Sequence, residues 1–242
     1  MANRKRAEAR RKAAARTDGG GSKKLWMWAA IVAVVAVAVV GIVIASNGSD
    51  AKTPGSASDG STLDTGQSAL PVSQPVKVAG DPLPQLPDKG TDTAIGKTAP
   101  VLDGLNFSNQ PIKVDSSKGA YMLVFLAHWC PHCNAEIPRL LDWKHSGQVP
   151  ADLNVIGVAT AVSPSSPNYP PATWFSNKGW EWPVLVDESQ GDRNGGKAAA
   201  AFGANGWPYF VIVGKDGKVK IRVSGEVAIP DLQKIVDKAL AG

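Results

Sequence analysis

The chain has 242 residues, two cysteines and a formal net charge of +5, which is enough length for one sizeable domain and additional segments. The positive charge lies at the start, because residues 1–24 contain nine Lys and Arg and two acidic residues, whereas residues 46–242 contain 17 Lys and Arg against 19 Asp and Glu. A nearly neutral remainder gives no reason to expect a nucleic-acid-binding domain.

Residues 25–45 form an uncharged run rich in Val, Ala and Ile, about 30 Å long as a helix and therefore long enough to cross a bilayer. No clear small-x-small cleavage motif follows the run. We therefore expect an uncleaved transmembrane helix, with a processed signal peptide as the alternative. Because the basic residues precede the run, we expect residues 1–24 to be a cytoplasmic tail, in a single-pass protein of the cell membrane whose C-terminal domain is extracytoplasmic.

Residues 46–92 are rich in Ser, Gly, Asp and Pro and show no sustained apolar periodicity. This composition predicts a flexible linker. From residue 93 onward, short apolar runs alternate with turn signals. We therefore expect residues 93–242 to fold as one domain with its own core.

Strands and helices alternate along the expected domain. Residues 121–127 are a continuous apolar run, which is typical of a buried central strand. The expected elements after it are a helix at 134–144 interrupted by Pro138, a strand at 153–160, a loop at 161–171, a helix at 172–178, a strand at 183–186, a helix at 197–202, a hairpin of strands 209–213 and 219–223, and a helix at 230–240. This order predicts an α/β domain.

The two cysteines, Cys130 and Cys133, stand three residues apart, directly after the buried strand and at the start of a helix. Unpaired N–H groups and the helix dipole lower the pKa of a thiol in that position. We therefore predict that Cys130 is the attacking sulfur and that Cys133, one turn further and more buried, resolves the mixed disulfide. Pro131 suits the first helical turn. His132 would add positive charge or a hydrogen-bond donor near the Cys130 thiolate.

Other interpretations of a Cys-x-x-Cys pair are weaker. Structural zinc lacks a second cysteine pair, and haem attachment needs a histidine where Asn134 stands. A purely structural disulfide remains an alternative, although so short a loop stabilises little. A different class of function, a copper-binding carrier, would use Cys130, Cys133 and His132 as soft ligands. For the enzyme we expect no metal and no cofactor.

Residues 129–133, Trp-Cys-Pro-His-Cys, resemble the active site of the thioredoxin superfamily, and residues 205–210, Asn-Gly-Trp-Pro-Tyr-Phe, resemble its cis-proline loop. The resemblance covers about residues 95–242 and implies a thioredoxin-like fold, a central mixed sheet flanked by helices. It implies that Pro208 packs in cis beside the cysteines and that Trp207 offers backbone groups to a bound peptide, with Trp129 also in the substrate site. A trans Pro208 that opens a strand is the alternative.

Within the superfamily, the anchor, the linker, residues 95–100 and the extra segment between residues 153 and 186 are similar to the TlpA/ResA branch. Glu136, three residues after Cys133, matches an acidic residue of that branch and would move protons to or from Cys133. The alternative for Glu136 is a solvated helix carboxylate. Val124 stands where cytoplasmic thioredoxins have a buried Asp, which points away from a general cytoplasmic reductase.

The sequence leaves the direction of electron transfer open. Pro-His between the cysteines is associated with strong oxidants of the DsbA type, whereas the branch suggested by Glu136 is more often reducing. The expected enzyme therefore acts in oxidative folding or in cysteine reduction during cytochrome maturation. Its expected partners are exported proteins with cysteines or disulfides and a membrane redox partner that resets the pair. Peroxide reduction fits less well, because peroxidatic cysteines usually sit in a different sequence context.

Overall fold

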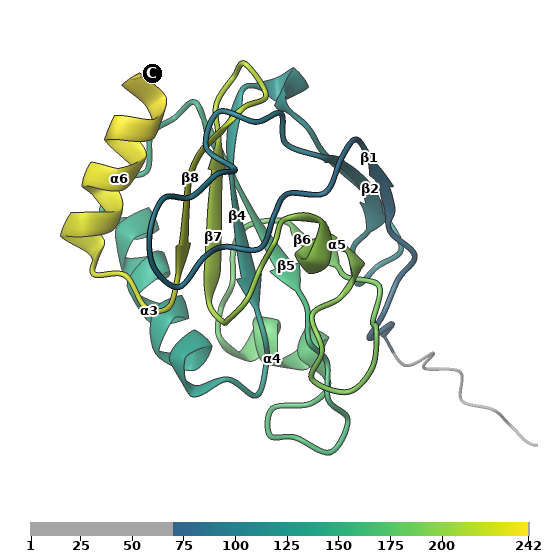
Figure 1. Ribbon diagram of the computed structural model, residues 1–242. Helices are drawn as coiled ribbons and strands as arrows, with labels where there is room; N and C mark the ends of the chain where they lie inside the picture. Colours follow the sequence, from purple (N-terminus) through teal and green to yellow (C-terminus); the bar gives the residue numbers. More distant parts are fainter. Residues whose placement is uncertain (1–69, 242) are drawn as a thin grey trace, which may run out of the picture. The chain divides into compact units, whose positions relative to one another are not determined.

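A mixed β-sheet forms the centre of the described part of the chain. The computed structural model describes residues 70–241, where eight strands form one sheet in the order β1-β2-β6-β5-β4-β7-β8, with β3 paired to β2 (Figure 1). The strands are β1 (Lys77–Ala79), β2 (Val101–Leu105), β3 (Pro111–Val114), β4 (Ala120–Leu126), β5 (Leu153–Ala159), β6 (Val184–Val186), β7 (Tyr209–Val213) and β8 (Val219–Ser224). β4, β5 and β6 run parallel, and β7 pairs antiparallel with β4.

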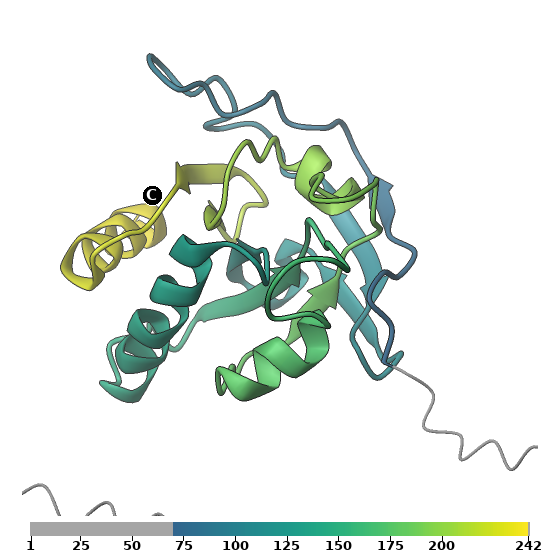
Figure 2. The same ribbon diagram turned by 90° about the horizontal axis from the view of Figure 1, so that it is seen from below.

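Helices cover both faces of this sheet. α3 (Pro131–His145), α4 (Pro171–Asn177) and α6 (Ile229–Ala241) contribute to one hydrophobic core. α5 (Lys197–Ala201) and the segment before β2 contribute to the second core, on the opposite face. A short 3-10 helix, η1 (Ser116–Lys118), precedes β4. Figure 2 shows these layers, with α6 in yellow on one side of the sheet and α5 in light green, next to the blue N-terminal segment, on the other. This arrangement is the predicted thioredoxin-like α/β fold.

β4 positions the two cysteines. All seven of its residues are buried, because β5 and β7 pair along its edges and helices cover its faces. The chain leaves the carboxyl end of β4 and enters α3 at Pro131. α3 therefore begins three residues before the predicted residue 134, and Pro138 lies inside it. The later helices and strands lie within one residue of their predicted bounds.

The folded part begins earlier than the predicted residue 93. β1 pairs antiparallel with β2, and Leu83, which is 5% exposed, donates its N–H to the carbonyl of Ala201 at 2.8 Å. Asp92 forms an ion pair with Arg222, whose side chain is buried. Isolated apolar residues among prolines give no periodic signal, which explains why the sequence predicted a flexible linker here and gave no indication of β1. β2 and β3, with five and four residues, are too short to show a periodicity.

The predicted cytoplasmic tail, the predicted transmembrane helix at 25–45 and the first part of the predicted linker lie outside the described residues. Between residues 70 and 241, none of the helices combines the length and the apolar character that a membrane span requires.

Candidate active site

Cys130 occupies the N-cap position of α3, with Pro131 in the first turn. Its N–H donates to the carbonyl of Ala127 at 3.0 Å, and its own carbonyl accepts from the N–H of Asn134 at 3.1 Å. Pro131 fits because the first turn of a helix needs no N–H donor. The local backbone therefore holds the Cys130 sulfur beside the free N–H groups at the start of α3, as the sequence predicted.

Hydrogen bonds to its sulfur make Cys130 acidic. The hydrogen bond from the Cys133 thiol lowers the pKa of Cys130 most, and the backbone N–H groups of Cys133 and His132 lower it further. Burial raises this pKa, and the charge of His132 makes the smallest contribution, which lowers it. Together these groups lower the pKa of Cys130 to about 6, against about 8.5 for an ordinary cysteine. At neutral pH the sulfur is therefore mostly thiolate, which is the nucleophilic form.

Cys133 has the opposite environment. It lies one turn inside α3 with 0% of its surface exposed, whereas Cys130 is 5% exposed. Burial is the main cause that raises the pKa of Cys133, and the hydrogen bond with Cys130 is the next. The inner thiol thus keeps its proton while the outer sulfur is ionised. This difference is the one needed for attack by Cys130 first and Cys133 second.

The cis-proline loop lies against the outer sulfur. The peptide bond between Trp207 and Pro208 is cis, so the alternative of a trans Pro208 is wrong. The Cys130 thiol donates to the carbonyl of Trp207 at 3.4 Å. The carbonyl of Pro208 accepts from the N–H of Gly225 at 2.8 Å. The loop at 205–210, far along the chain from the cysteines, therefore presents backbone groups at the mouth of the dithiol.

Glu136 is a buried carboxyl group, with 0% of its surface exposed. The alternative of a solvated helix carboxylate is therefore wrong. Arg139 donates to it at 3.0 Å, and the N–H of Val227 lies 3.4 Å from both oxygens. Burial outweighs these contacts and raises the pKa of Glu136. Its charge in turn contributes to the raised pKa of Cys133, so the two groups influence each other's protonation.

His132 is exposed and contacts a residue that sequence reasoning missed. Its Nδ1 lies 2.6 Å from Oε1 of Glu226, and this hydrogen bond raises the pKa of His132. Glu226 also pairs with Arg139. Because Glu226 lies 94 residues after His132, no local spacing in the sequence connects it to the cysteines.

The dithiol geometry agrees with the comparison to known families. The AhpC/TSA family model matches residues 95–222, which is more than half of the chain and includes both cysteines. The chain belongs to the AhpC/TSA family. This membership confirms the predicted resemblance to the thioredoxin superfamily and supports an oxidoreductase activity. Among curated proteins, none matches this chain.

Several solved structures are similar to this AhpC/TSA-family protein. A thioredoxin-family thiol:disulfide interchange protein from Chlorobium tepidum is 24% identical, with 60% of this chain and 96% of that chain covered and a TM-score of 0.47. StoA from Bacillus subtilis is 14% identical, with coverages of 59% and 94% and a TM-score of 0.43. A thiol-disulfide isomerase from Corynebacterium glutamicum is 18% identical, with coverages of 52% and 82% and a TM-score of 0.44.

Aromatic and basic side chains border the cysteines of the AhpC/TSA-family domain. Trp129 is half-buried and donates its Nε1–H to the carbonyl of Ala161 at 2.6 Å, while the guanidinium carbon of Arg193 lies 5.0 Å from its ring centre. Trp207 is also half-buried. The Trp207 carbonyl contacts Cys130, and Trp129 directly precedes it in the chain, so a role of both side chains in substrate binding stays a prediction.

His128 connects the end of β4 to the loop before α4. Its Nδ1 lies 2.8 Å from the carbonyl of Pro167, and its Nε2 accepts from the N–H of Ser163 at 3.2 Å. Accepting at Nε2 assigns the proton to Nδ1, and burial lowers the pKa of His128, so the ring is neutral. His128 thus fixes the loop beside Trp129 and offers no charge to the cysteines.

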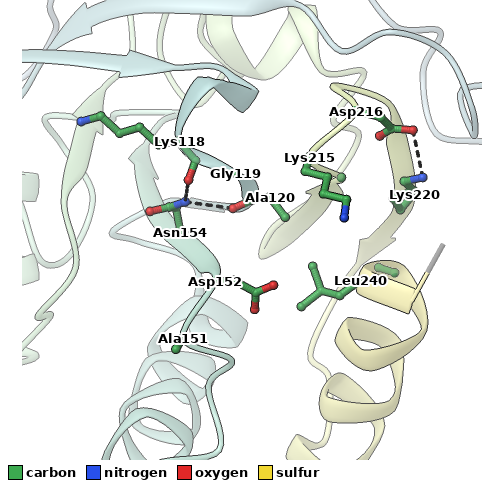
Figure 3. A pocket seen from close by; sticks show the side chains of 12 residues that line it. Lys118, Gly119, Ala120, Ala151, Asp152, Asn154, Lys215, Asp216, Lys220 and Leu240 are labelled. Atoms are coloured by element: carbon green, nitrogen blue, oxygen red, sulfur yellow. Dashed lines mark hydrogen bonds and ion pairs between the residues drawn. The ribbon is translucent and has the colours of Figure 1, made fainter.

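Other features of the domain lie apart from the dithiol. Among residues 70–241, no three His, Cys, Asp or Glu side chains come together in a way that would hold a metal ion. A cavity of about 280 Å³ is lined by Gly119 and Ala120 at the start of β4, by Lys215 and by Leu240 of α6 (Figure 3). Because the cysteines follow the other end of β4, this cavity is not part of their site.

The environment of Cys130 predicts the effect of changing its neighbour. We expect Cys133→Ala to raise the pKa of Cys130 by about one unit or more, because the variant loses the thiol donor. Cys133→Ser keeps a hydroxyl donor, so it should raise the pKa of Cys130 less than Cys133→Ala does. The ultraviolet absorbance of the thiolate, followed against pH in each purified full-length variant, measures both values. An unchanged pKa in Cys133→Ala would contradict the assigned hydrogen bond.

Proposed function

We propose that the protein is a thiol-disulfide oxidoreductase that exchanges disulfides with exported proteins through Cys130 and Cys133. One observation carries the proposal: an acidic sulfur at the mouth of α3 is hydrogen-bonded to a buried thiol that keeps its proton. Such a pair has a ready nucleophile and a second sulfur within reach of it, which is what dithiol exchange requires.

The exchange has two balanced steps. The Cys130 thiolate attacks a substrate disulfide, forms a mixed disulfide and releases one substrate thiolate. Cys133 then loses its proton and attacks the Cys130 sulfur, so that the protein disulfide forms and the second substrate thiolate leaves. Two electrons pass from the protein to the substrate. The same steps in reverse oxidise a substrate dithiol.

Glu136 is the group we propose to accept the proton of Cys133. Its carboxyl is buried and its pKa is raised by that burial, which brings it closer to the pH range where it can exchange a proton. Val227 and Arg139 hold the carboxyl in place. A base of this kind is needed because the pKa of Cys133 is raised far above that of a free thiol.

The substrate peptide is proposed to bind beside the cis-proline loop, between Trp129 and Trp207. The carbonyl of Trp207 accepts from the protonated Cys130 thiol. When Cys130 ionises, this carbonyl loses its donor and becomes available to a substrate N–H. Pro208 cannot donate a hydrogen bond, and its fixed ring shapes the loop that meets the substrate.

The acidity of Cys130 favours the oxidising direction. Stabilising the thiolate stabilises the dithiol form of the protein, which makes its disulfide a stronger oxidant. His132, held next to Glu226, contributes positive charge in the same sense. We therefore propose that the protein takes electrons from substrate thiols and returns them to a membrane redox partner.

We further propose that the domain works outside the cytoplasm. The uncharged run at residues 25–45 and the basic residues before it support an anchor with its N-terminus inside. An oxidising environment is also where protein disulfides persist.

Substitution of each cysteine separates the two steps. Cys130→Ser should abolish the oxidation of a substrate dithiol and the reverse reaction, because the sulfur that forms the mixed disulfide is missing. Cys133→Ser should accumulate mixed disulfides with partner proteins, because the resolving sulfur is missing. Non-reducing gels of the full-length variants, followed by reduction and mass spectrometry, measure the trapped species. If Cys133→Ser traps nothing while the wild type turns over, the assigned order of attack is incorrect.

The reduction potential decides the direction. We expect the full-length protein, equilibrated in glutathione buffers, to show a two-electron potential of about −120 to −180 mV, in the range of oxidants and isomerases. A value near about −270 mV or lower would make it a reductant. Tight binding of Cu(I) with no exchange on a model dithiol would instead support a copper carrier.

A reporter fusion tests the location. Alkaline phosphatase, which needs disulfides to become active, should be active in bacteria when it is fused after Gly60 and inactive when it is fused after Ser22. Activity in the second fusion alone would contradict the proposed orientation. Activity in neither would contradict export.

A further inference from the structure

Glu226 lies in the loop between β8 and α6 and contacts two side chains of α3. One of its oxygens lies 2.6 Å from Nδ1 of His132, and the other pairs with Arg139. Arg139 in turn donates to Glu136 at 3.0 Å. Each thiol therefore has a neighbour that is connected to the Glu226 carboxylate. His132, beside Cys130, contacts Glu226 directly, and Glu136, near Cys133, is connected to it through Arg139.

The backbone of this loop is also fixed to the site. Gly225, with a φ of 94°, donates its N–H to the carbonyl of Pro208 at 2.8 Å. The N–H of Val227 points to both oxygens of Glu136 at 3.4 Å. Glu226 thus sits between one residue that holds the cis-proline loop and another that holds Glu136. The backbone on both sides of Glu226 is therefore held by the site.

We propose that Glu226 is a positioning residue that couples the two thiols, holding His132 beside Cys130 with one oxygen and sharing Arg139 with Glu136 through the other. This inference rests on the proposed function, because it gives one loop carboxylate an influence on both the acidity of the attacking sulfur, Cys130, and the deprotonation of the resolving sulfur, Cys133. Glu226 itself touches neither sulfur.

The signs of the two effects follow from the charges. A carboxylate partner favours the imidazolium form of His132, and a cation next to Cys130 favours the thiolate. Loss of Glu226 should therefore make Cys130 less acidic. Arg139 would then serve Glu136 alone and the like charge beside Glu136 would be gone, so Glu136 should ionise more easily.

Among residues 70–241, the charged side chains that act on Glu226 come from α3. On α3 these are His132, Glu136 and Arg139. On α6, Asp231 pairs with Lys234 of its own helix at 3.0 Å. The α3 groups are therefore those through which a charge change at position 226 is expected to act.

A second glutamate, Glu181, contacts the other end of α3 and provides a matched control. Glu181 pairs with His145 and with Lys144, each at 2.8 Å, so it contacts one histidine and one lysine of α3 without approaching the cysteines. Glu181→Gln removes the same kind of surface contact as Glu226→Gln. Any effect specific to the two cysteines should appear in Glu226→Gln and not in Glu181→Gln.

The test is the alkylation rate of Cys130 against pH in full-length protein carrying Glu226→Gln, His132→Ala or both. We expect Glu226→Gln to slow alkylation near neutral pH by about two- to fivefold, which is the range for an exposed ion pair. In the His132→Ala background the same substitution should add little, because the effect passes through the histidine. Glu226→Asp should restore part of the rate.

The second arm measures how fast the mixed disulfide resolves at each pH. Glu226→Gln should move the pH dependence of resolution to lower pH, and His132→Ala should leave that shift unchanged. Equal effects of Glu226→Gln on the alkylation rate with and without His132, the same effects from Glu181→Gln, or no change in either rate would each overturn the coupling. A wild-type protein that fails to exchange disulfides would instead overturn the proposed function, because Cys130 alkylation needs no turnover.

Discussion

The hydrogen bonds to the Cys130 sulfur are the interaction on which the chemistry of this domain depends. The buried Cys133 thiol and the N–H groups at the start of α3 stabilise a negative charge on that sulfur. The same hydrogen bond, together with burial, keeps the proton on Cys133. A single geometric arrangement therefore produces one nucleophile and one protected thiol, and every further step needs that difference.

The fold supplies this arrangement from three places. β4, a central strand buried along its whole length, ends just before the cysteines, and α3 begins there with a proline, which has no N–H to donate. The cis-proline loop brings the Trp207 carbonyl to the outer sulfur. The loop after β8 adds Glu226 and Val227, whose contacts reach His132 and Glu136. The residues that set the protonation of the two thiols are thus also the residues that hold α3 and these two loops together.

Much of this was predictable because it is local. The apolar run of β4, the spacing of Cys130 and Cys133 and the hairpin of β7 and β8 each show in a few consecutive residues, and Pro208 follows from resemblance to a known loop. Glu226 was not predictable, because its partner His132 is 94 residues away and nothing in its neighbourhood marks it. The burial of Glu136 likewise depends on α6 and its preceding loop, and the short strands β1 to β3 depend on pairing rather than on periodicity.

The most direct measurement of this account is the ionisation of Cys130 in the full-length protein. Alkylation of the reduced protein across a range of pH, with the modified cysteine located by mass spectrometry, reports the thiolate fraction at that position. The account predicts an inflection near pH 6 with modification confined to Cys130. An inflection near about 8.5, as for a free cysteine, or equal modification of Cys133, would contradict it.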